Sequence, residues 1–71
     1  MSAAYPVKID PEIMHGAPCF SGTRVPVKTL FDYLTHGRTI HYFLEQYPTV
    51  EPEQVITLLE LAKELVSRPA E

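Results

Sequence analysis

The sequence predicts a mainly α-helical fold with a short β element at its N-terminal end. Three amphipathic segments follow one another after residue 26, and each repeats apolar side chains at helical spacing. Two short extended segments precede them, punctuated by glycine and proline. A chain of 71 residues has room for one domain. We therefore expect a single domain over 1–71, with a β strand or hairpin and a turn in 7–25 and three helices in 26–68.

The predicted β element consists of residues 5–9 and 18–20. Residues 5–9 alternate in the manner of a strand, and Asp10-Pro11 ends it because proline has no amide hydrogen to donate to a sheet. Two strands this short are marginally stable by themselves. A chain of this length also buries only about 60% of the surface that it exposes when unfolded, which leaves its stability marginal. We therefore expect a homodimer in which the β element pairs with that of a second copy.

The stretch from residue 16 to 27 predicts a sharp turn from the second strand into the first helix. Gly16 and Gly22 can adopt backbone angles that are closed to other residues, and two prolines restrict the backbone between and after them. Arg24 is the only charged residue in this stretch. Its guanidinium group could cap carbonyl groups of the turn, pair with a carboxylate or contact a phosphate group, and the sequence favours structural bonding over contact with phosphate.

Proline, glycine and threonine mark the bounds of the three predicted helices. The first begins near Pro26 and ends at Gly37, since proline suits the first position of a helix and glycine the residue just past its end. The second begins after Thr39 as N-cap and ends before Pro48. The third spans about residues 52–68. Its apolar face is wide enough for two contacts, one within the chain and one with a partner.

Composition narrows the possible functions. Nine acidic and six basic side chains give a net charge of -3, and the basic residues are scattered, so charge alone does not indicate a nucleic-acid-binding protein. No apolar run approaches the length of about 18 residues that crosses a bilayer. The first residues lack the pattern of a signal peptide. We therefore expect a cytoplasmic protein.

The sequence offers no pattern typical of catalysis or metal binding. Its histidines lie on different predicted elements, and Cys19 has neither a second cysteine nor a base beside it, which favours a buried small hydrophobe over a ligand or nucleophile. Tyr33, Tyr42 and Tyr47 lie near the apolar stripes of predicted helices, which favours packing over stacking on bases. We expect neither enzymatic activity nor a cofactor or metal.

Three helices with a short turn before the last fit a helix-turn-helix, in which the last helix can lie in a major groove. Many small helical bundles share this pattern. Three glutamates, counting Glu53, oppose Lys63 and Arg68 on the outward face of the third helix, which makes that face a poor phosphate binder. These outward positions are Thr57, Glu60, Lys63, Glu64 and Arg68.

Several short motifs, in their order and spacing, resemble the domain-of-unknown-function family numbered 433, a group of small proteins similar to antitoxins of the VapB type. The resemblance covers about residues 9–64. Its most specific part is a Gly-x-Pro, Gly-Thr-Arg and Pro-Val combination, followed at the right distance by Tyr-Pro. The motifs are Ile9-Asp10-Pro11, His15-Gly16-Ala17-Pro18, Gly22-Thr23-Arg24-Val25-Pro26-Val27, Gly37 with Thr39, Tyr47-Pro48 and Pro52-Glu53-Gln54-Val55.

This resemblance implies a homeodomain-like helix-turn-helix after a short β segment. It also implies a noncatalytic antitoxin that neutralises a PIN-like ribonuclease toxin, while the complex binds its own operator DNA. Residues 22–24 would form the signature turn, and residues 52–68 the helix in the recognition position. The chain departs from the family pattern at Ala17, where a basic or polar residue is common, and at His41-Tyr42, which replaces an acidic pair.

Two functions follow from these observations. In the first, a homodimer presents paired basic residues to operator DNA at half-sites about one helical turn apart, while an apolar surface engages the toxin. In the alternative, the protein is a dimeric protein-interaction module with no DNA-binding role, which its acidic balance favours. The residues predicted to contact DNA are Arg24, Lys28, Arg38, Lys63 and Arg68.

Overall fold

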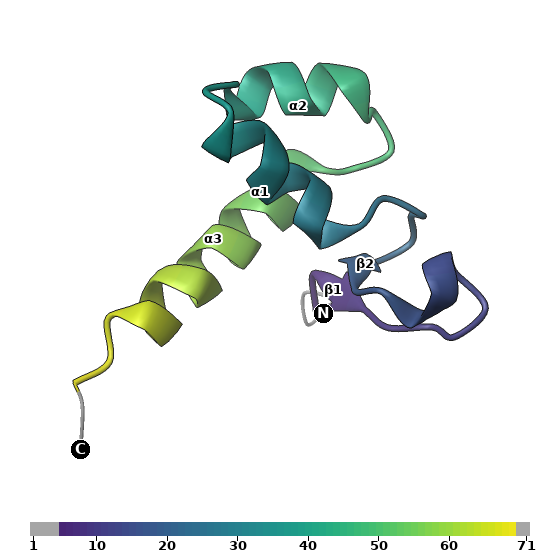
Figure 1. Ribbon diagram of the computed structural model, residues 1–71, viewed down its shortest axis with the longest axis horizontal. Helices are drawn as coiled ribbons and strands as arrows, with labels where there is room; N and C mark the ends of the chain where they lie inside the picture. The colour runs from purple at the N-terminus through teal and green to yellow at the C-terminus, as the bar shows by residue number, and fades with distance from the viewer. Residues whose placement is uncertain (1–4, 70–71) are drawn as a thin grey trace.

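A computed structural model describes residues 5–69 as three helices and a two-stranded hairpin (Figure 1). The predicted fold class, mainly α-helical with an N-terminal β element, is confirmed. The first four and last two residues of the predicted domain lie outside the described residues. In chain order the elements are β1 (Val7–Lys8), a 3-10 turn (Met14–Gly16), β2 (Cys19–Phe20), α1 (Val27–Thr35), α2 (Ile40–Gln46) and α3 (Pro52–Val66).

The strands β1 and β2 pair with each other in antiparallel orientation, with Val7 opposite Phe20 and Lys8 opposite Cys19. The other edge of β2 is also occupied, because Phe20 N donates to Val25 O at 3.0 Å. The segment that leads into α1 therefore lies beside β2 and completes its hydrogen bonds within one chain. A second copy could therefore extend the hairpin only at the outer edge of β1.

The connection between the strands contains a left-handed turn that the sequence did not predict. Met14 and His15 have φ angles of 51° and 57°, and Gly16 follows at 84°. Only glycine adopts this region without steric cost, and other residues lose about 1–2 kcal/mol each. Two hydrogen bonds hold the turn, from Gly16 N to Ile13 O and from Ala17 N to Met14 O, both at 3.0 Å.

One apolar cluster forms the core, and the hairpin, all three helices and two connections contribute to it. Burial is nearly complete for four large side chains, and the described part of the chain buries no polar or charged side chain. Cys19 is buried beside this cluster with a free thiol, as predicted. The clustered residues are Phe20, Val25, Leu30, Phe43, Val50, Val55 and Leu58.

The helix bounds follow the sequence signals closely. Pro26 is the N-cap of α1 instead of its first residue, and Gly37, just past the end of α1, has the expected positive φ of 81°. Thr39 caps α2, because its Oγ1 accepts from Tyr42 N at 3.0 Å. The third helix begins at residue 52 as predicted, but it ends at Val66, two residues before the predicted end.

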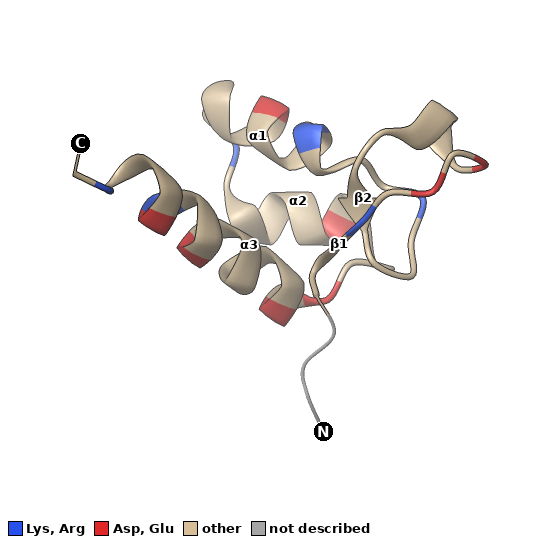
Figure 2. Ribbon diagram, turned by 90° about the horizontal axis from the view of Figure 1, so that it is seen from below, with Lys and Arg blue, Asp and Glu red and all other residues tan. Residues whose placement is uncertain are grey.

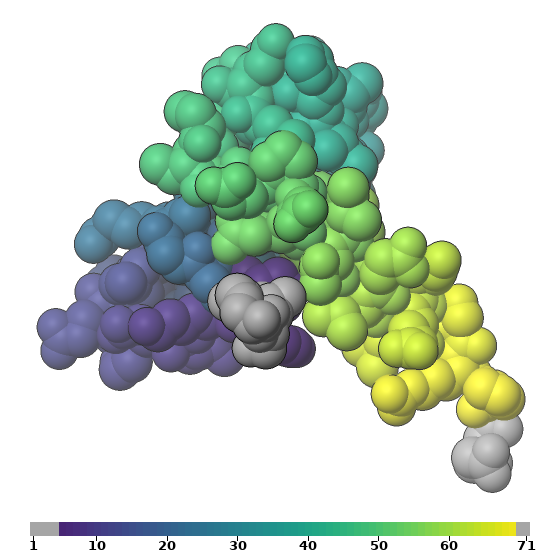
Figure 3. Space-filling view, turned by 180° about the vertical axis from the view of Figure 1, so that it is seen from behind, coloured from purple at the N-terminus to yellow at the C-terminus, as the bar shows by residue number. Residues whose placement is uncertain are grey.

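The C-terminal half of α3 extends beyond the core. Val55 and Leu58 in its first half are buried, whereas Leu65 and Val66 near its end are 65% and 81% exposed. Figures 1 and 3 show this half of the helix standing clear of the hairpin and of the other helices.

Candidate nucleic-acid interface

The signature turn is held by the side chain of Thr23. Its Oγ1 donates to Phe20 O at 2.8 Å and accepts from Val25 N at 3.0 Å. Gly22 makes the turn possible with a φ of 78°. Arg24 then projects into solvent, and no hydrogen bond or ion pair of its guanidinium group is found within residues 5–69. Within these residues the guanidinium group therefore neither caps a carbonyl group of the turn nor pairs with a carboxylate, contrary to the structural role that the sequence favoured.

A pocket of about 550 Å³ lies beside this turn. Its floor is largely apolar, and Lys8, Asp10 and Arg24 carry the charges around it. Lys8 was not among the predicted site residues, although its position in an alternating strand indicated an outward side chain. The pocket brings this second cation to the same concave surface as Arg24. Its lining residues are Lys8, Asp10, Ile13, Ala17, Cys19, Gly22, Thr23, Arg24, Val25 and Thr49.

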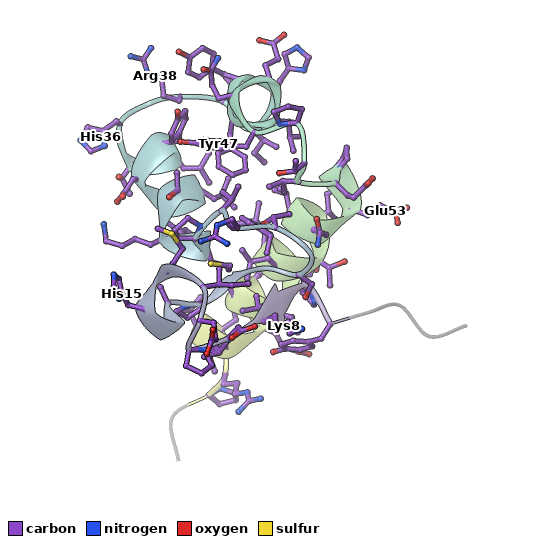
Figure 4. The ribbon with its side chains drawn as sticks, turned by 90° about the vertical axis from the view of Figure 1, so that its right-hand side faces the viewer. Lys8, His15, His36, Arg38, Tyr47 and Glu53 are labelled. Atoms are coloured by element: carbon purple, nitrogen blue, oxygen red, sulfur yellow. The ribbon has the colours of Figure 1, made fainter. Side chains whose placement is uncertain are left out.

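Lys28 and Arg38 lie at opposite ends of α1. The Nζ atom of Lys28 is 2.9 Å from Asp32 Oδ2, one helical turn further along, and both side chains are exposed. The guanidinium carbon of Arg38 lies 5.3 Å from the ring centroid of Tyr42, which is a cation–π distance. Figure 4 shows Arg38 at the end of the molecule opposite Lys8. Both cations face solvent, but they are not adjacent.

Three tyrosines pack with Phe43 in one aromatic cluster centred on Tyr33, in agreement with the packing role that the sequence predicted. The ring centroid of Tyr33 lies 5.5 Å from that of Phe43 and 5.8 Å from those of Tyr42 and Tyr47. Hydrogen bonding with Tyr47 is the main cause that raises the pKa of Tyr33 above 10.0, and Arg38 acts in the opposite direction. Tyr33 therefore stays neutral at physiological pH, and it adds no negative charge beside Arg38.

The outward face of α3 has the exposed residues that the sequence predicted. Lys63 is paired with a glutamate on this face, with 3.2 Å between its Nζ atom and Glu60 Oε1. Glu53 and Glu64 add further negative charge, and Arg68 follows the end of the helix. This face would repel phosphate along most of its length, because phosphate contacts require cations.

The five residues predicted to bind DNA do not form one patch. Figure 2 shows basic segments on separate elements and acidic segments along α3. Arg24, Lys28 and Arg38 belong to α1 and its flanks, whereas Lys63 and Arg68 belong to the C-terminal end of α3. The pocket unites only Arg24 with Lys8.

Within residues 5–69, no group of three histidine, cysteine, aspartate or glutamate side chains is placed to hold a metal ion. None of the helices described is both long and apolar enough to span a bilayer.

Comparison with known proteins identifies a family but no individual relative. Residues 7–62 match the family described as "Protein of unknown function (DUF433)". The match begins at the first residue of β1 and ends inside α3, so it includes the hairpin, the signature turn and the first two helices. No curated protein and no solved structure matches the chain. The matched region is most of the sequence, and the chain therefore belongs to the DUF433 family.

Proposed function

We propose that this protein is a noncatalytic antitoxin that neutralises a PIN-like ribonuclease toxin and binds operator DNA as a dimer. The likeness of its family to VapB-type antitoxins and the three-helix architecture with an exposed α3 both support this proposal. The toxin would bind an exposed apolar surface of the folded domain. The DNA-binding role would make the protein a regulator of its own promoter.

One observation favours DNA contact by α1 and its flanks over groove reading by α3. Arg24, Lys28 and Arg38 are exposed there, whereas the outward face of α3 is dominated by glutamates. Neutralising phosphate groups releases counterions and supplies most of the affinity that is independent of DNA sequence. In a dimer each of these cations occurs twice, which compensates for the small number in one copy.

The test is a titration of the purified protein with a labelled fragment of its own promoter at several salt concentrations. The logarithm of the affinity should fall linearly with the logarithm of salt, by about 0.9 for each phosphate neutralised. Replacing Arg24, Lys28 and Arg38 together by alanine should flatten this slope. Lys63→Ala separates the two helices and should leave the slope unchanged, because Lys63 lies among glutamates on α3 and not on α1 or its flanks. A slope of zero for the unmodified protein would exclude phosphate neutralisation.

The acidic face of α3 favours a second candidate function. A dimeric protein-interaction module would hold a toxin or another partner without binding DNA, and negative charge on its most exposed helix suits that role. The same titration, repeated with the product of the neighbouring gene, separates the two candidates. Binding of that protein without any retention of the promoter fragment would favour the interaction module.

A further inference from the structure

The two faces of the hairpin have different surroundings. Val7 and Phe20 lie directly opposite each other and face the core, to which both contribute. Lys8 and Cys19 form the next pair, and their side chains lie on the other face, because successive residues of a strand point to opposite faces. Cys19 is buried there, outside the core cluster. This second face of the hairpin carries the pocket beside the signature turn.

The floor of this pocket is a small apolar surface. Ile13 and Ala17, from the connection between the strands, are half-buried, whereas Cys19 and Val25 are buried. The thiol of Cys19 donates to Ala17 O at 3.4 Å, and this contact links the connection to β2. The pocket volume of about 550 Å³ lies within the range of about 300–1,000 Å³ that is usual for small-molecule sites. The floor is therefore large enough for a small organic molecule.

Two cations and one carboxylate lie among the lining residues. Lys8 comes from β1 and Arg24 from the signature turn, and within residues 5–69 neither side chain forms an ion pair. The carboxylate is that of Asp10, whose Oδ1 accepts from Glu12 N at 2.8 Å. Two positive charges and one negative charge leave an excess of one positive charge. The pocket therefore attracts an anion.

The cations and the floor together indicate which anion fits. A guanidinium group pairs well with carboxylate or phosphate, and an ammonium group adds further donors. A phosphate ion would leave the apolar floor in contact with water, and a nucleotide would place polar groups against that floor at a desolvation cost. A carboxylic acid with an apolar body avoids both costs. Its single negative charge also matches the excess charge of the pocket.

We propose that this pocket binds a small carboxylic acid with an apolar body. The carboxylate group lies between Lys8 and Arg24, and the apolar body covers Ile13, Ala17 and Val25. This binding role goes beyond the antitoxin function and does not depend on it, because neither DNA nor a toxin takes part in the contact. Contact between Arg24 and a DNA phosphate needs only the guanidinium group, whereas the acid needs the floor as well.

A titration with phenylbutyrate tests the ligand class. Chemical shifts of the backbone amide groups of the isotope-labelled protein would be followed by nuclear magnetic resonance. A probe of this size should bind with a dissociation constant of about 1 mM and shift the amide signals of residues 8–10 and 22–25. The absence of saturable shifts up to about 10 mM would overturn the proposal.

Matched probes separate the contributions of the charge and of the floor. Phenylbutyramide lacks the negative charge and acetate lacks the apolar body, so each should bind about tenfold more weakly than phenylbutyrate. Equal binding of phenylbutyramide would show that the two cations do not hold the ligand. Tighter binding of inorganic phosphate than of phenylbutyrate would show a phosphate site instead. Either result would overturn the proposal.

Charge substitutions test where the carboxylate group of the probe lies. Arg24→Gln should raise the dissociation constant of phenylbutyrate by about fivefold. Arg68→Gln removes the same charge after the end of α3, away from the pocket, and is the matched control that should leave the constant unchanged. Both arginines are exposed, so the fold should be retained. Equal effects of the two substitutions would overturn the proposed position of the carboxylate.

Asp10→Asn tests the same contact in the opposite direction. The substitution removes the negative charge among the lining residues, whereas an asparagine Oδ1 can still accept from Glu12 N. The dissociation constant of phenylbutyrate should therefore fall by about two- to threefold. Thermal unfolding of the variant would confirm that the turn is intact. Weaker binding by a folded Asp10→Asn protein would contradict an anion site at this pocket.

Discussion

At the scale of single residues, the left-handed turn between the strands is the most strained backbone feature among residues 5–69. Met14 and His15 both carry a side chain in a region that favours glycine, and both are exposed. Little packing is available there to offset the steric cost. The turn therefore lowers the stability of the hairpin.

Replacing His15 with glycine should make the protein more stable. The substitution removes a steric cost of about 1–2 kcal/mol from the folded state. Glycine also makes the unfolded chain more flexible, and this lowers the gain in stability by about 0.5–1 kcal/mol. We expect a net gain of about 0.5–1 kcal/mol in the free energy of unfolding, measured by urea denaturation. His41→Gly, within α2, is the control and should lose stability. A loss in both variants would contradict the proposed strain at residue 15.

At this scale the sequence predicts the turn glycines well, but it does not predict the strained residues or the environment of Arg24. Gly22 and Gly37 were expected at turns, and both have positive φ angles. The left-handed Met14 and His15 carry no such signal, because nothing in their side chains favours that conformation. The exposure of Arg24 could not be predicted either, since a guanidinium group has too many possible partners for its sequence context to select one.

At the scale of elements, Gln54 joins the start of α3 to the signature turn. Its Nε2 donates to Ser21 O at 2.9 Å, and its Oε1 accepts from Glu51 N at 2.8 Å. One amide group thus caps the helix and fixes its position relative to the hairpin.

Replacing Gln54 with alanine should lower the free energy of unfolding by about 1–2 kcal/mol, because two hydrogen bonds are lost. Thermal unfolding followed by circular dichroism would measure the change. Gln46→Ala is the control, since Gln46 is exposed at the end of α2. Its effect should be within about 0.5 kcal/mol of zero. Equal losses in the two variants would show that the amide contacts of Gln54 do not stabilise the fold.

The bounds of the helices were predictable because their signals are local. Thr39 and Gly37 act on groups within a few residues of themselves, so the sequence contains the whole interaction. The bond between Gln54 and Ser21 joins residues 33 positions apart. No local pattern predicts such a contact. The early end of α3 also has a local cause, since Ser67 is the C-cap and Pro69 disfavours helical angles at Arg68.

At the scale of the whole molecule, stability depends on one small cluster with Phe43 near its centre. The ring centroid of Phe43 lies 6.0 Å from that of Phe20 and 5.1 Å from that of Tyr47. The ring therefore links α2 both to the hairpin and to the connection that leads into α3. The described residues contain no disulfide that could substitute for it.

Phe43→Ala should leave the isolated protein largely unfolded. Removing a buried phenylalanine costs about 3–5 kcal/mol. A chain of this size has only about 4–10 kcal/mol of stability in total. Far-ultraviolet circular dichroism at room temperature would report the loss of helix. Tyr42→Ala removes a partly exposed ring from the same helix and should remain folded. A folded Phe43→Ala protein would show that the core is more redundant than its packing indicates.

The fold class was predictable at this scale, whereas the arrangement of the site was not. Periodicity fixes which face of each helix is apolar, and three such faces can close around one core. The relative placement of Arg24, Arg38 and Lys63 depends on the angles between helices, which periodicity does not contain. The sequence therefore supplied the five candidate cations without showing that they separate into two groups.

The shared hydrogen bond between Ser21 and Gln54 has a mechanical consequence. It ties the start of α3 to the residue just before the signature turn, because the Gln54 amide donates to the Ser21 carbonyl oxygen. A partner that displaces Ser21 would therefore have to break this bond or shift the start of α3 with it.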